Sequence, residues 1–217
     1  GVDDKRLCLI PWGIETDIFR PTPADRIETR KRLEIDISAK VVFCPRAISD
    51  IYNIDIVIES IKTIALKVPK LCLILLSFNV NSHYLKRIEQ MISEHELEKS
   101  VIWLPPQENS AAMARLYRMA DIVISIPSSE GYGFTAYEAM ASGCPTIISD
   151  LPVFQGELID GIHTMKVPVR DVVQIRSALI DLLGNKVLRE EIRRNALTVC
   201  REKSIKIRTE RTVNLYK

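Results

Sequence analysis

The chain has 217 residues, of which 47% are hydrophobic and 27% are charged, with 30 Lys and Arg against 28 Asp and Glu. This composition excludes a disordered, collagen-like or low-complexity protein and is typical of a globular protein of one large or two small domains. The longest uninterrupted apolar run, residues 71–76, is far shorter than the roughly 18–20 residues that span a bilayer, so we expect a soluble, cytoplasmic protein.

Short β-branched or leucine-rich runs alternate with segments of helical periodicity, a pattern typical of a parallel α/β sheet. The predicted strands are residues 41–44, 71–76, 101–103, 122–126, 146–148 and 164–167. Because these runs are apolar on both faces, we expect a sheet covered by helices on both sides and joined by right-handed crossovers.

The helices between these strands begin at recognisable polar residues. Asn53 is placed to cap an apolar stripe over residues 54–65, while Ser82 and Ser110 precede the next two helices. Asp171 precedes a helix that extends to residue 183. Two further helices, 186–202 and 205–216, follow without another strand. The prediction is therefore an α/β fold, a doubly wound parallel six-stranded Rossmann-like sheet with a C-terminal helical extension.

The five cysteines and three histidines form no recognisable metal or disulfide pattern. The cysteines are Cys8, Cys44, Cys72, Cys144 and Cys200. An odd number of scattered cysteines, with no CxxC pair, predicts packing residues in a reducing compartment. The histidines are isolated in the sequence, so we expect no metal.

The C-terminal helices carry the basic charge of the chain. Residues 186–217 contain ten Lys and Arg against four Glu. We interpret this as a solvated helix face, with a peripheral contact to anionic lipid as the alternative. Only one aromatic residue, Tyr216, lies among these charges, which argues against nucleic-acid binding by base stacking. Trp12 and Trp103 are interpreted as packing residues rather than sugar platforms.

The loop after the fourth predicted strand is the candidate for chemistry, because ligands of an open parallel sheet bind beyond the carboxyl ends of its strands. Gly131 and Gly133 remove two Cβ atoms where the backbone enters a helix, so amide groups there can approach an anion closely. Glu130 and Glu138 flank the same helix start, and carboxylates accept hydrogen bonds from hydroxyl groups. A phosphate site beside hydroxyl-binding groups describes a nucleotide sugar.

A structural interpretation of the same loop is open. Glycine-rich turns after strands are common, and a glutamate in the first turn of a helix complements the helix dipole without binding a ligand. The loop is neither a GxGxxG dinucleotide fingerprint nor a P-loop, since no Gly-Lys-Ser/Thr follows a strand.

The segment SSEGYGFTAYEAMASGCPTIISD, residues 128–150, resembles the donor-binding core of retaining glycosyltransferases of the GT-B fold, family 4. The family pattern has two glutamates separated by seven residues, followed by Glu-Ala-Met-Ala-x-Gly-x-Pro. The flanking segments IPWGIETDIFRP and LPVFQGELIDGIHTMKVP are also similar to the family, so the resemblance covers nearly the whole chain. It implies the C-terminal, nucleotide-sugar domain of a GT-B fold.

The resemblance also implies roles for individual residues. Glu130 would bind hydroxyls of the donor sugar, Glu138 would hold the ribose, and Arg46 would neutralise the diphosphate. Glu157 would be a mainly structural residue. The backbone that would line the sugar and diphosphate is Gly131, Tyr132, Gly133, Phe134 and Thr135, and the backbone that would meet the base is Leu104, Pro105 and Pro106. The family mechanism uses no metal and no cofactor besides the nucleotide sugar.

The sequence departs from the family pattern at one charged position. The family usually has a Lys-Gly pair several residues after the arginine, and the corresponding residues here are Tyr52 and Asn53. The loss of a cation should weaken stabilisation of the leaving diphosphate, at a cost of about 10²-fold or more in rate. Either another cation replaces it or catalysis is impaired.

The resemblance further implies that residues 1–20 are an inter-domain segment, residues 21–184 the nucleotide-sugar domain and residues 185–217 the C-terminal helices. The acceptor would bind through an N-terminal half that this sequence does not contain, so we expect the chain alone to bind the donor with little turnover. The alternatives are a non-catalytic nucleotide-sugar sensor or scaffold and a nucleotide-sugar epimerase of the same fold.

Overall fold

The computed structural model describes residues 7, 8 and 10–216. In this part of the chain, six strands form one all-parallel sheet of order β3-β2-β1-β4-β5-β6. The strands are β1 (Lys40–Cys44), β2 (Leu71–Leu76), β3 (Val101–Leu104), β4 (Ile122–Ser125), β5 (Thr146–Ser149) and β6 (Met165–Val167). The predicted Rossmann-like sheet is confirmed, with strand bounds within one residue of those expected.

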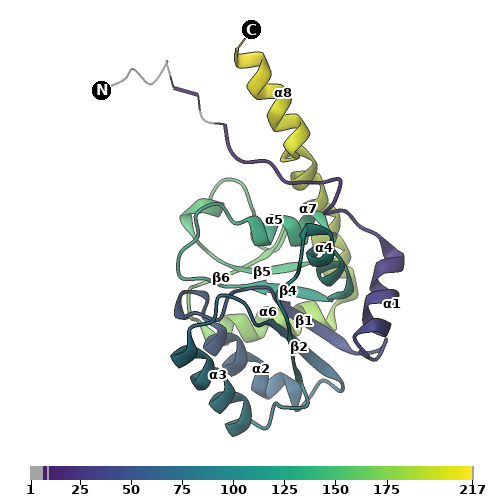
Figure 1. Ribbon diagram of the computed structural model, residues 1–217, viewed down its shortest axis with the longest axis vertical. Helices are drawn as coiled ribbons and strands as arrows, with labels where there is room; N and C mark the ends of the chain where they lie inside the picture. The colour runs from purple at the N-terminus through teal and green to yellow at the C-terminus, as the bar shows by residue number, and fades with distance from the viewer. Residues whose placement is uncertain (1–6, 9, 217) are drawn as a thin grey trace.

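Helices cover both faces of the sheet (Figure 1). The helices of the described residues are α1 (Pro23–Arg32), α2 (Ile54–Ala65), α3 (Ser82–Glu94), α4 (Ser110–Met119), α5 (Phe134–Ala141), α6 (Val172–Gly184), α7 (Lys186–Glu202) and α8 (Ile205–Leu215). Alternate side chains of β1 point to opposite faces, so Val41 and Phe43 pack with α4 and α5 while Val42 and Cys44 pack with α2, α3 and α6. Both faces are therefore buried, as the apolar strand runs predicted.

Several predicted caps differ in the structure. Asn53 stands at the N-cap of α2, but its backbone is left-handed (φ 53°) and its side chain does not cap the helix. The caps of α3 and α4 are Asn81 and Asn109, each one residue before the expected serine, and their side-chain amide oxygens accept hydrogen bonds from the free N–H groups of the first turn. Asp171 caps α6 as predicted.

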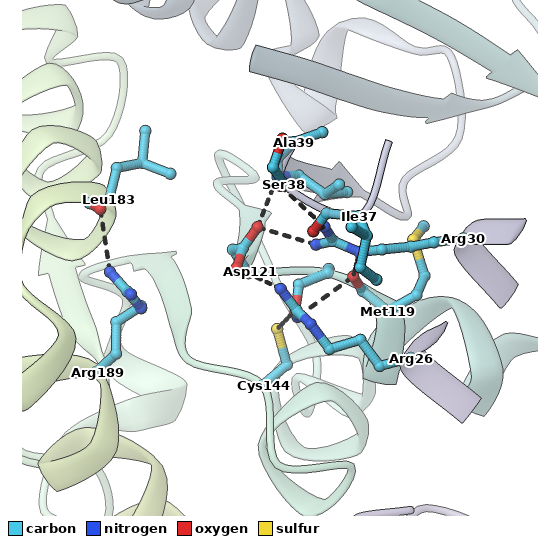
Figure 2. A network of polar contacts seen from close by, with 12 residues as sticks. Arg26, Arg30, Ile37, Ser38, Ala39, Met119, Asp121, Cys144, Leu183 and Arg189 are labelled. Carbon is cyan, nitrogen blue, oxygen red and sulfur yellow. Dashed lines mark hydrogen bonds and ion pairs between the residues drawn. The ribbon is translucent and has the colours of Figure 1, made fainter. Parts of the chain in front are cut away.

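Helix α1 was not predicted, and it is anchored by a buried guanidinium. Arg30 is fully buried and donates to the carbonyl oxygens of Met119 (2.9 Å) and Ala39 (2.8 Å) and to the Asp121 carboxylate (3.0 Å). Figure 2 shows Arg26 reaching the same carboxylate, at 2.7 Å. This network joins α1 to the amino ends of the central strands β1 and β4. The candidate site lies at the opposite, carboxyl ends of the strands.

The N-terminal segment and the last helix lie together. Ile14 pairs with Ser204 just before α8, and α8 stands out from the body of the molecule beside the N-terminal segment (Figure 1). Residues 1–6 and 9 of the predicted inter-domain segment, and Lys217 of the basic tail, lie outside the described residues. Among the helices described, none has the length and apolar character needed to cross a membrane.

Four of the five cysteines are buried packing residues, as expected, and Cys8 is exposed; none forms a disulfide. The prediction for Trp12 is wrong, because this residue is 71% exposed; its ring lies near that of Phe134, with centroids 6.5 Å apart. Trp103, on the edge strand β3, does pack against the α2–α3–α6 side of the core.

Candidate functional site

The strand order places the candidate residues at one point of the sheet. β1 and β4 are neighbours, and from them the connections proceed to opposite edges. This is the switch point at which doubly wound folds open a ligand crevice beyond the carboxyl ends of the strands. Arg46 follows β1 and Glu130 follows β4, so two residues 84 positions apart come into contact there.

Arg46 is the centre of this contact. Its guanidinium donates to the Glu130 carboxylate at 2.5 Å and to the Thr135 hydroxyl at 2.7 Å. It also lies 4.3 Å from the centroid of the Tyr52 ring, within the range of a cation–π interaction. The guanidinium is thus held on one side by an aromatic face and on the other by a carboxylate and a hydroxyl, with its side chain only 10% exposed.

Helix α5 presents a bare N-terminus to this cluster. Its N-cap is Gly133, which has φ +90° and no side chain that could accept the first N–H groups of the helix. A Cβ at this position would lie 2.3 Å from the Phe154 ring, so glycine is required by both conformation and space. The free N–H groups and the positive end of the helix dipole favour an anion here.

Glu138 lies one helical turn further into α5 and is mostly buried. Its carboxylate accepts a hydrogen bond from the Tyr117 hydroxyl at 3.1 Å. Burial raises the pKa of Glu138 to about 7, with Glu15 adding to the rise and Tyr117 and Arg46 opposing it. A carboxyl group of this kind changes its charge near neutral pH, and among the described residues it receives one hydrogen bond, so it is suited to accept ligand hydroxyls.

The residues at the family's Lys-Gly positions have structural roles in this chain. Tyr52 stacks on Arg46. Asn53 is fully buried and has the left-handed backbone that glycine adopts without strain, which fits its alignment with a glycine. Its amide donates to the Ile126 carbonyl (2.8 Å) and the Ser128 hydroxyl (3.0 Å), so it ties the loop after β1 to the loop after β4.

Not all predicted residues meet at this cluster. Leu104, Pro105 and Pro106 lie at the end of the edge strand β3, two strands away from β1 in the sheet. Tyr132 donates from its hydroxyl to the Trp12 carbonyl, and its ring packs on Phe134, 4.8 Å away between centroids. The Gly131 amide donates to the carboxylate of its neighbour Glu130, at 3.1 Å.

Glu157 binds residues of the helical layer. Its carboxylate accepts from the Tyr137 hydroxyl and the Lys203 ammonium, both at 2.6 Å. Burial works to raise the pKa of Glu157, but these two hydrogen bonds hold it below its usual value. The contact joins the loop after β5 to the end of α7, in agreement with a structural role.

Two contacts of the cluster were not predicted, namely the Tyr117 hydroxyl beside Glu138 and the Tyr52 ring on Arg46. Tyr117 lies on α4 in an apolar segment that predicts core packing, and its ring does pack against Phe43 (5.7 Å between centroids). Only the position of its hydroxyl beside Glu138 distinguishes it from a core residue, and that contact spans 21 residues of sequence. Within the described residues, no group of three or more His, Cys, Asp or Glu could hold a metal ion.

Residues 25–199 match the family described as glycosyl transferases group 1. The chain belongs to this family. The curated relatives of this chain include the D-inositol 3-phosphate glycosyltransferases of Mycobacterium bovis and Mycobacterium tuberculosis. These proteins are 30% identical to it over 186 residues. The alignment covers 84% of this chain and 37% of the relative, so the chain spans little more than a third of the curated proteins that it matches.

Solved glycosyltransferase structures share the fold. HepE from Anabaena, solved in complex with UDP and glucose, is 17% identical, with a TM-score of 0.86 over 100% of this chain and 58% of HepE. The C-terminal domain of a group 1 glycosyl transferase from Francisella tularensis is 23% identical, with a TM-score of 0.78 over 88% of this chain and 98% of that domain. The fold of this chain is therefore that of the C-terminal half of GT-B glycosyltransferases.

Proposed function

We propose that this chain is the donor-binding domain of a retaining glycosyltransferase and binds a nucleoside diphosphate sugar at the switch point between β1 and β4. The observation that carries the proposal is the convergence of Arg46, Glu130 and the uncapped start of α5 at this point, with Glu138 one turn behind. A cation, a bare helix N-terminus and two carboxylates match the phosphates and hydroxyls of such a donor.

Each group has a role set by its chemistry. The Arg46 guanidinium and the N–H groups of α5 stabilise the charge of the diphosphate as the sugar leaves. Glu130 accepts hydrogen bonds from sugar hydroxyls, and Glu138 accepts them from the ribose. The backbone of the loop up to Thr135 lines the sugar and diphosphate, and the backbone of residues 104–106 meets the base.

The comparisons support a nucleotide sugar as the donor, because HepE has been solved with UDP and with UDP-glucose. Since the chain covers 37% of its curated relatives, the acceptor site is assigned to the remainder of the protein. We retain the division into an inter-domain segment (1–20), a donor domain (21–184) and C-terminal helices (185–217). No metal or further cofactor is invoked, and the basic tail is available for a peripheral membrane contact.

A second candidate is a non-catalytic nucleotide-sugar sensor or scaffold. Tyr52 favours this candidate, because it occupies the position at which the family usually has a lysine. The charge of the diphosphate would then be neutralised by Arg46, which is already paired with Glu130. Turnover by the full-length protein separates the two candidates, and the identity of the product separates a transferase from an epimerase.

Calorimetric titration of the 217-residue chain with UDP, GDP, ADP and their sugar conjugates tests the proposal. One nucleotide should bind selectively, and more tightly as its sugar conjugate. Glu138→Ala should weaken binding of the nucleotide about tenfold, and Glu130→Ala should remove the additional affinity of the conjugate, since each loses charge-assisted hydrogen bonds. Glu190→Ala, which changes a surface glutamate paired with Arg193, is the control. Unchanged affinities in both site variants would refute the assignment.

A turnover assay gives a separate prediction. The chain alone should transfer little or no sugar, because the acceptor is bound elsewhere, whereas the full-length protein should transfer it with retained anomeric configuration. Efficient transfer by the chain alone would contradict the proposed division of labour, even if the donor site itself were correct.

A further inference from the structure

The hydroxyl group of Tyr117 lies where no packing role requires it. The Tyr117 ring is 1% exposed and packs in tilted contacts against Phe19 and Phe43, which account for its burial. The hydroxyl reaches across to α5 and donates to one carboxylate oxygen of Glu138, at 3.1 Å. Among the described residues, this is the hydrogen bond that the Glu138 side chain receives, so its second oxygen is available to a ligand.

Each of the two carboxylates of the candidate site has its own side-chain donor. Arg46 donates to both Glu130 and the Thr135 hydroxyl. Tyr117 donates to Glu138 one turn further along α5, so both carboxylates of the site are held by side-chain donors.

We propose that Tyr117 is a positioning residue of the donor site, which fixes the orientation of the Glu138 carboxylate and holds it in its charged form for the ribose hydroxyls. The inference rests on the proposed function, in which Glu138 binds the nucleotide. Tyr117 itself touches no ligand in this arrangement and acts through Glu138. Its hydroxyl replaces a water molecule that would otherwise solvate the carboxylate and compete with the ligand.

The charged groups around Glu138 set the expected pH dependence. Burial and the Glu15 carboxylate favour the neutral acid, while the Tyr117 hydroxyl and the Arg46 guanidinium favour the carboxylate. Removal of the Tyr117 hydroxyl leaves Arg46 alone to oppose the effects of burial and Glu15, so the pKa of Glu138 should rise further above 7. One lost hydrogen bond to a charged group corresponds to a rise of about one pH unit.

The test is a Tyr117→Phe variant, which keeps the ring and removes only the hydroxyl. The matched control is Tyr84→Phe: Tyr84 is also 1% exposed, and its hydroxyl donates to a buried carboxylate, Asp55, at 2.8 Å on the other face of the sheet. Two measurements are made on the 217-residue chain: the affinity for the preferred nucleoside diphosphate between pH 5.5 and 9, and the carboxyl titration of Glu138 followed by carbon NMR in the free protein.

Tyr117→Phe should raise the midpoint of the Glu138 titration by about one unit and weaken nucleotide binding about fivefold at pH 7, with a smaller loss at pH 9 where the carboxylate forms in either case. Tyr84→Phe should leave both curves as in the parent. If Tyr117→Phe behaves like the control in both measurements, Tyr117 is a packing residue and the inference is wrong. If the parent binds no nucleotide, the proposed function fails, while the titration in the free protein still decides whether Tyr117 controls Glu138.

Discussion

Gly133 is the residue at which the donor site depends most directly on backbone geometry. Replacing it with alanine places a Cβ 2.3 Å from the buried Phe154 ring, at a φ of +90°. Strain and overpacking together should cost about 2–4 kcal/mol of unfolding free energy, measured by denaturant titration. Gly131→Ala is the matched control, since a Cβ there meets no atom within 4 Å. Equal stabilities of the two variants would show that the start of α5 can adjust.

The site residues that the sequence predicts are those carried by a local pattern. Glu130, Gly133 and Glu138 lie within nine residues, and their spacing alone places them around one helix start. The role of Tyr117 could not be predicted, because a tyrosine in an apolar helix segment has the same sequence signature whether or not its hydroxyl is hydrogen-bonded. The sequence places Tyr52 at a site position but does not show that its ring lies on Arg46. Their roles depend on contacts with Arg46 and Glu138 that only the folded sheet creates.

At the scale of the element, α1 depends on Arg30. Burial lowers the pKa of the Arg30 guanidinium and works to raise that of Asp121, but Arg26, the Val41 amide and Arg30 itself hold the pKa of Asp121 below its usual value. Arg30→Met should therefore leave a buried carboxylate short of one partner and cost about 3–5 kcal/mol, measured by denaturant titration.

The control for this variant is Arg32→Met, two residues further along α1 and exposed. It should change the stability by less than about 0.5 kcal/mol. Similar losses in the two variants would mean that α1 is held by its general charge and not by the Arg30 network.

The same helix explains which elements the sequence predicts. The strands were located within a residue because each is a short run of buried apolar side chains with few alternatives. Helix α1 has no apolar stripe, and the buried residues within it are Thr29 and Arg30. A helix that packs through a guanidinium has the sequence pattern of a polar, solvent-exposed segment, so hydrophobic periodicity cannot detect it.

At the scale of the whole molecule, the two ends of the sheet carry opposite kinds of polar structure. At the amino ends, Arg30 and Asp121 are satisfied by protein partners and join α1 to the core. At the carboxyl ends, Glu138 is mostly buried and accepts one hydrogen bond within the described part of the chain, where α5 also begins without a side-chain cap. Polar groups left short of partners reduce stability, and they are concentrated where a ligand would supply the missing contacts.

The loss of stability caused by the buried Glu138 carboxylate should appear in the dependence of the unfolding free energy on pH. The pKa of Glu138 is raised from 4.5 to about 7 in the folded chain, so between these values the folded state binds more protons than the unfolded state. Its contribution is therefore present at acidic pH and is lost as the pH rises towards 7, about 3 kcal/mol in total. Glu138→Gln should remove this loss, so the stability of the variant relative to the parent should increase between pH 5 and pH 8.

Glu157 should contribute a pH dependence of stability opposite in sign to that of Glu138, because its pKa is lowered and not raised. Its pKa is lowered by Lys203 and Tyr137, so it stabilises the fold above its unfolded pKa, and that contribution is lost as the pH falls. Glu157→Gln should lower stability at pH 8 and have little effect near pH 3. Denaturant titrations of both variants from pH 3 to pH 8 should thus give difference curves of opposite slope. Parallel curves would mean that at least one of the two glutamates lacks the environment described for it, whereas opposite slopes would distinguish the proposed ligand-binding glutamate, Glu138, from Glu157, which joins α7 to the core.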